Sequence, residues 1–118
     1  MIDEELLELA AKAAGSDFSN KLIPEVQGKR KGPFILKGSR WVQWDPLTDD
    51  GDALRLAVKL NMGISIPVMA ATHARVDVIT FRNSGVNVME SCNNDPYAAT
   101  RRAIVRAAAE IGRNMKND

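Results

Sequence analysis

The chain is poor in cysteine, histidine and aromatic residues, and each shortage removes a class of chemistry. Cys92 is the only cysteine, so no internal disulfide can form, and we expect a reducing compartment. His73 is the only histidine, so Cys92 and His73 form the one candidate pair of nucleophile and base. Because no family signature surrounds them, the sequence favours an exposed turn histidine and a strand-end cysteine, and we expect no enzyme. Aromatic residues make up 5%, so Val, Ile, Leu, Ala and Met must fill most of the core.

The chain also lacks a long apolar run and an excess of charge of either sign. No segment comes close to the roughly twenty consecutive apolar residues that a helix needs to cross a bilayer. The start, Met1 to Glu5, is acidic where a secretory signal is basic, so we expect a cytoplasmic protein with no membrane partner. The 16 basic and 15 acidic residues give a net charge of +1, which excludes a global attraction to nucleic acid. A length of 118 residues predicts a single domain over 1–118.

Apolar periodicity predicts three helices. The first covers residues 3–14 and stops at Gly15. The second covers about 49–60, begins after Asp45-Pro46, and is closed by Asn61 and Gly63. The last begins at Asp95-Pro96 and places Tyr97, among others, on its apolar face.

Alternating apolar residues predict strands at 64–68, 75–81 and 86–90, and shorter strands at 34–36 and 41–44. Pro67 cannot donate to a ladder, so the 64–68 strand is expected at a sheet edge. Short connections favour an antiparallel meander. The fold class is therefore α+β: an α/β sandwich with a three-stranded or four-stranded meander sheet packed by three helices, in the order α-(β)-α-β-β-β-α.

Two charged clusters invite functional interpretations. Asp45, Asp49, Asp50 and Asp52 resemble a metal site in composition, but they lack the alternating spacing and distal glutamate of a calcium loop. Helix capping explains them better, and we expect no metal and no cofactor. The loop-rich 20–38 stretch and the residues after it carry a local excess of basic charge beside aromatic rings. The residues that would contact nucleic acid are Lys29, Arg30, Lys31, Lys37, Arg40 and Trp41, with Trp44 or Phe34 as alternative stacking partners.

Three arginines, Arg102, Arg106 and Arg113, follow the side of the last helix opposite its apolar face. Such a stripe is typical of a solvated surface. The alternative is a contact surface for an acidic patch on a partner protein.

Four features follow one another along the chain: the Trp41 and Trp44 stretch, the helix start Pro46-Leu47-Thr48-Asp49, the short sheet, and the Arg-Ala-rich segment 98–108. In this order they resemble the phage ABA sandwich domain, a family of small phage and prophage proteins. The resemblance implies an α/β sandwich and a phage or prophage origin, and it brings no activity, cofactor or catalytic residues.

The function that these observations favour is a non-enzymatic accessory protein that binds another protein. The expected contact surface is the exposed sheet edge near Pro67 or the arginine stripe. A nucleic-acid-binding accessory protein that uses the basic 29–40 segment is the first alternative, and an unrecognised small enzyme is the second. The sequence leaves homo-oligomerisation open.

Overall fold

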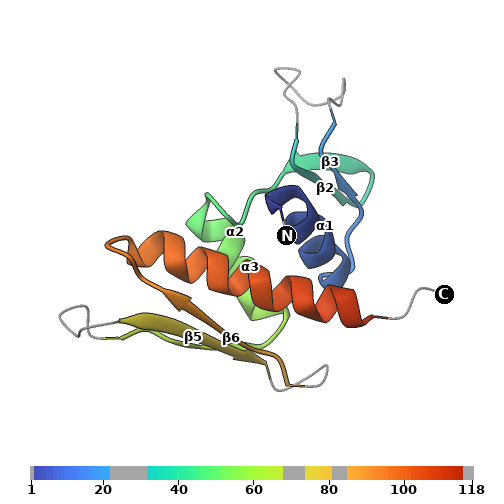
Figure 1. Ribbon diagram of the computed structural model, residues 1–118. Helices are drawn as coiled ribbons and strands as arrows, with labels where there is room; N and C mark the ends of the chain where they lie inside the picture. The colour runs from blue at the N-terminus through green and yellow to red at the C-terminus, as the bar shows by residue number, and fades with distance from the viewer. Residues whose placement is uncertain (1, 22–31, 68–73, 81–84, 116–118) are drawn as a thin grey trace.

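The structure, a computed structural model, describes residues 2–21, 32–67, 74–80 and 85–115, which form three helices and two three-stranded antiparallel sheets (Figure 1). The predicted α+β class is confirmed, and the elements follow nearly the predicted order. The difference is the second sheet. The stretch before the middle helix contributes strands to a sheet of its own, where the sequence suggested at most a fourth strand of the meander.

The last helix, α3 (Pro96–Asn114), is the centre of the molecule. It lies between the strands of the meander on one side and α1 (Asp3–Ala13) and α2 (Asp50–Lys59) on the other (Figure 1). Two-sided packing requires small side chains around most of the helix, and five alanines of α3 are buried. At Gly112 the backbones of α3 and α1 approach so closely that a Cβ would overlap the carbonyl group of Leu9.

The meander consists of β4 (Met62–Ser65), β5 (Arg75–Thr80) and β6 (Asn87–Ser91), in that spatial order. The predicted alternation of buried and more exposed side chains is seen in β5, where Val76 and Val78 are fully buried. The predicted edge position of the first of these strands is also confirmed. The strand itself starts earlier and ends at residue 65, so Pro67 lies beyond it and Gly63 lies within it. Asn61, with a φ of 55°, makes the turn that separates it from α2.

The second sheet consists of β1 (Phe18–Ser19), β2 (Phe34–Lys37) and β3 (Arg40–Gln43). The two short strands predicted near 34–36 and 41–44 are therefore present, and they form a hairpin around Gly38, whose φ is 61°. Phe18 contacts Trp44 edge-on at 6.4 Å between ring centroids. Trp44 is buried, so this sheet is anchored to the same core as the helices.

Two residues of the predicted apolar face of the last helix, Tyr97 and Met115, lie at the surface. Tyr97 is 70% exposed, although its spacing placed it on the apolar face of the last helix. It occupies the second position of α3, directly after Pro96, and lies at the rim of a hollow between α3, α2 and β4. The prediction for Tyr97 was therefore wrong, and the exposed ring becomes part of a surface groove.

Candidate protein-binding groove

An apolar groove of about 280 Å³ lies where α2, the edge strand β4 and the start of α3 meet. It exists because α3 packs over β5 and β6, leaving part of β4 and the residues after it uncovered. The lining side chains come from all three elements: Asp50, Ala53, Leu54, Ile64, Ile66, Tyr97, Thr100, Arg101 and Ile104.

Three large apolar or aromatic side chains of the groove are open to solvent. Leu54 is 60% exposed, Ile66 is 62% exposed and Tyr97 is 70% exposed. Val58, one helical turn after Leu54, is also exposed. Single apolar residues on a surface are ordinary, but a contiguous group around a hollow is typical of a contact site. We define the apolar groove by Leu54, Ile64, Ile66 and Tyr97.

The strand beside the groove has an open edge. β4 pairs with β5 on one side only, and its other side has no backbone partner among the described residues. An edge strand presents a row of unpaired N–H and C=O groups to any extended chain that approaches it. The groove therefore combines pockets for side chains with a template for backbone hydrogen bonds.

The charges at the groove are compensated. The Arg101 guanidinium donates to Asp50 at 2.6 Å, and its Nε donates to the carbonyl oxygen of Leu47 at 2.9 Å. Arg101 thus holds the start of α2 against α3 and forms one wall. Because its charge is already paired, the groove favours apolar groups over a charged ligand.

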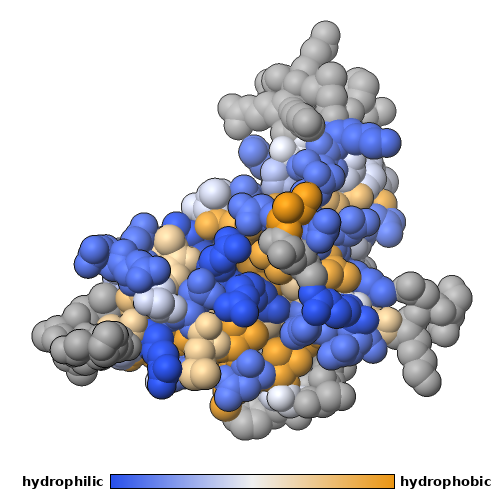
Figure 2. All heavy atoms as spheres, viewed as in Figure 1, coloured by the Kyte–Doolittle hydropathy of each residue, from blue (hydrophilic) through white to orange (hydrophobic). Residues whose placement is uncertain are grey.

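The three arginines of the predicted partner surface line a different cleft, of about 270 Å³, between α3 and β6. Arg106 and Arg102 both pair with Glu90 of β6, and Arg102 also pairs with Asp3 of α1 at 3.3 Å. Arg113 pairs with Glu110 at 3.0 Å. Figure 2 shows hydrophilic side chains gathered over α3 on this face. Each arginine has an acidic partner within the chain, so this face offers less uncompensated charge to a partner than the stripe suggested.

The residues predicted to contact nucleic acid are divided between two faces of the β2–β3 hairpin. Lys37 and Arg40 are direct cross-strand partners and share one face, whereas Trp41 pairs with Leu36 on the other. The structure therefore does not place the Trp41 ring beside these two charges. Lys29, Arg30 and Lys31 lie outside the described residues.

Cys92 is buried, and its N–H donates to the carbonyl oxygen of Ala74. His73 lies outside the described residues, so its pairing with Cys92 stays a prediction.

The acidic cluster is used for capping. Asp49 accepts from the Asp52 N–H at 2.8 Å, and Asp52 in turn accepts from the Asp45 N–H at 2.9 Å. In the part of the chain that the structure describes, no group of three His, Cys, Asp or Glu side chains is arranged to hold a metal ion.

The sequence placed an expected contact surface at the sheet edge near Pro67, next to Ile66, but it missed the helix residues of the groove and the neighbouring Val58. Leu54 and Val58 are the apolar residues of α2 that lie off its buried face, which holds Ala53, Leu56 and Ala57. That departure from amphipathic periodicity is the signal that could have identified them. Ile66 and Tyr97 carried no such signal.

Comparison with known proteins gives no further guidance, because no family model, curated protein or solved structure matches this chain. Among the described helices, none has the length and apolar character needed to cross a membrane.

Proposed function

We propose that this chain is a non-enzymatic binding protein whose apolar groove receives an extended, apolar segment of a partner protein. The observation that carries the proposal is the exposure of Leu54, Ile66 and Tyr97 beside the open edge of β4. The resemblance to the phage ABA sandwich domain supports an accessory role in a phage or prophage, in the cytoplasm of the host.

The shape of the site argues for an extended segment over a helix. A strand added to β4 would satisfy the open backbone groups, while its alternate side chains would point toward one face of the sheet. The groove volume of about 280 Å³ suits one or two apolar side chains, and the edge of β4 runs past it. An amphipathic helix would fill the groove but leave the strand edge unpaired.

Selection from a yeast-displayed library of random linear peptides tests the proposal. We expect the selected peptides to carry apolar residues at alternate positions. Binding should weaken by at least about tenfold in Leu54→Asp and Ile66→Asp, since each change places a charge where an apolar contact forms. Met89→Asp is the matched control, because Met89 is exposed on the opposite edge strand, β6.

Three outcomes would contradict the proposal. The first is equal affinity of the selected peptides for the wild type and Leu54→Asp. The second is a selection that yields no binder. The third is a homodimer in sedimentation that Leu54→Asp dissociates, because the occupant would then be a second copy of the chain. Thermal unfolding of each variant checks that the exposed substitutions leave the fold intact.

A further inference from the structure

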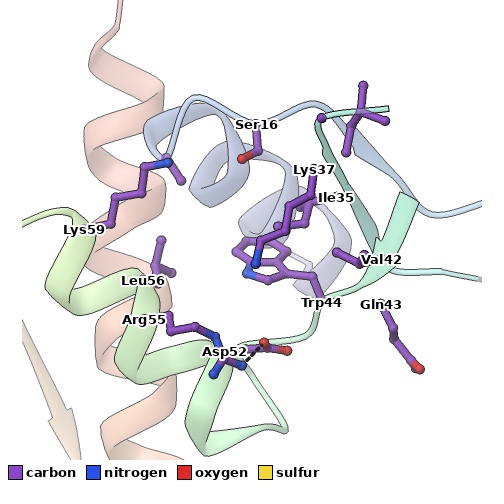
Figure 3. A pocket seen from close by; sticks show the side chains of 13 residues that line it. Ser16, Ile35, Lys37, Val42, Gln43, Trp44, Asp52, Arg55, Leu56 and Lys59 are labelled. Carbon is purple, nitrogen blue, oxygen red and sulfur yellow. Dashed lines mark hydrogen bonds and ion pairs between the residues drawn. The ribbon is translucent and has the colours of Figure 1, made fainter. Parts of the chain in front are cut away.

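A second hollow, separate from the apolar groove, lies between the β2–β3 hairpin and α2 and has a volume of about 710 Å³ (Figure 3). Its apolar lining comes from Ile35, Val42 and Trp44 on the sheet side and Leu56 on the helix side. Small-molecule sites typically measure about 300–1,000 Å³ and are lined by apolar and aromatic groups with a few polar ones. We call this hollow the hairpin cleft.

Three of the six polar side chains that line the hairpin cleft are cations. Lys37 reaches toward it from β2, and Lys59 and Arg55 reach toward it from α2 (Figure 3). Arg55 is paired with Asp52, the one carboxylate among the lining residues, at 2.7 Å. Neither lysine has an acidic partner among the described residues. The cleft thus presents two uncompensated ammonium groups above an apolar floor.

Arg40 of the hairpin is a further cation beside Lys37, although it does not itself line the cleft. Arg40 is the cross-strand partner of Lys37, so two positive side chains lie directly opposite each other on one face. Like charges in this position destabilise a strand pair. No carboxylate in the described part of the chain pairs with either of them, so their repulsion is not relieved within the fold. A bound anion would relieve it.

We propose that the hairpin cleft binds a small amphipathic anion, with its apolar body on Trp44, Ile35 and Val42 and its carboxylate or phosphate between Lys37 and Lys59. The apolar floor disfavours a fully hydrated inorganic ion. The two lysines without an acidic partner in the described part of the chain, Lys37 and Lys59, disfavour a neutral or cationic lipid-like molecule. The site is independent of the apolar groove, which uses a different face of α2 and has compensated charges.

Decanoate, kept below its micelle-forming concentration, is the probe. We expect it to change the fluorescence of a Trp41→Phe protein, in which Trp44 is the only tryptophan. Decanamide, which has the same chain and no charge, should bind at least about tenfold more weakly. The double variant Lys37→Met, Lys59→Met should weaken decanoate binding about tenfold, because two partly exposed ion pairs are lost. Lys21→Met is the matched control, since this exposed lysine follows β1 and does not line the cleft.

Equal binding of decanoate and decanamide would overturn the proposal, as would an equal loss of affinity in Lys21→Met. Decyl phosphate serves as a second probe, and it distinguishes a phosphate from a carboxylate preference. A single-stranded oligonucleotide that binds more tightly than either probe, and that loses affinity in the double lysine variant, would show a nucleic-acid site instead. Both lysines are exposed, and Lys37→Met removes the repulsion with Arg40, so thermal unfolding should show no loss of stability in the variants.

Discussion

Individual aspartates in this chain act at the starts of the helices. Asp95 accepts a hydrogen bond from the Ala98 N–H at 3.0 Å, and Asp49 makes the equivalent contact in α2. The first four N–H groups of a helix have no partner within it, so a side-chain oxygen at the N-cap satisfies one of them. The Asp95 cap was predicted from the sequence, because Pro96 follows it at the first helical position. For α2 the sequence left Thr48 and Asp49 as alternative caps, and the structure places Asp49 at the N-cap.

The cap at Asp95 can be tested by a pair of substitutions. We expect Asp95→Ala to lower the free energy of unfolding by about 1 kcal/mol, because the Ala98 N–H loses its acceptor. Asp95→Asn keeps an acceptor oxygen but removes the negative charge that interacts with the helix dipole. It should therefore lower the free energy of unfolding by only roughly a few tenths of a kcal/mol. Urea unfolding measures both. If Asn lowers stability as much as Ala, the hydrogen bond is not the source of the effect.

At the scale of elements, the crossing of α1 and α3 depends on one glycine. Periodicity predicted both helices and most of their buried faces. It gave no sign that Gly112 lies against Leu9, because the close approach depends on how two distant segments pack. A glycine inside a helix usually lowers its stability, so its presence here is explained by the packing of the two backbones.

Replacement of Gly112 by alanine should therefore destabilise the protein, by about 1–2 kcal/mol. Alanine improves helix propensity by up to about 1 kcal/mol, but its Cβ overlaps the Leu9 carbonyl, and overpacking typically costs about 1–3 kcal/mol or more. Gly51→Ala in α2 is the control, because its Cβ would meet the flexible end of Arg55 at 3.1 Å. We expect that control to be neutral or stabilising in urea unfolding. A stabilising Gly112→Ala would contradict the described crossing.

At the scale of the whole molecule, the sequence predicted the α+β class, the meander and its edge strand, because alternation and turn residues are local signals. It did not predict the second sheet, since pairing of β1 with β2 joins segments separated by the 20–33 stretch. Of the binding surfaces, the sequence pointed only to the sheet edge near Pro67, which lies next to Ile66, and not to the helix residues beside it. The apolar groove collects Leu54 of α2, Tyr97 of α3 and Ile66 of the segment after β4, and the packing of α3 over β5 and β6 leaves them exposed.

The apolar groove and the hairpin cleft differ in charge and in the kind of ligand that they suit. The apolar groove has paired charges and an open strand edge, which suits an extended protein segment. The hairpin cleft has unpaired lysines above a tryptophan, which suits a small anion. The ion-paired arginines of α3 hold β6 and α1 in place and are assigned no ligand.

The most direct test of protein binding at the apolar groove is amide hydrogen exchange, measured with and without a peptide selected on the wild-type chain. If the segment adds to β4, the outward amides within residues 62–65 should exchange more slowly in the complex, because they gain hydrogen-bond acceptors. The amides of the opposite edge, β6, should be unchanged. Slower exchange in β6 or in the β2–β3 hairpin, with β4 unaffected, would contradict the account.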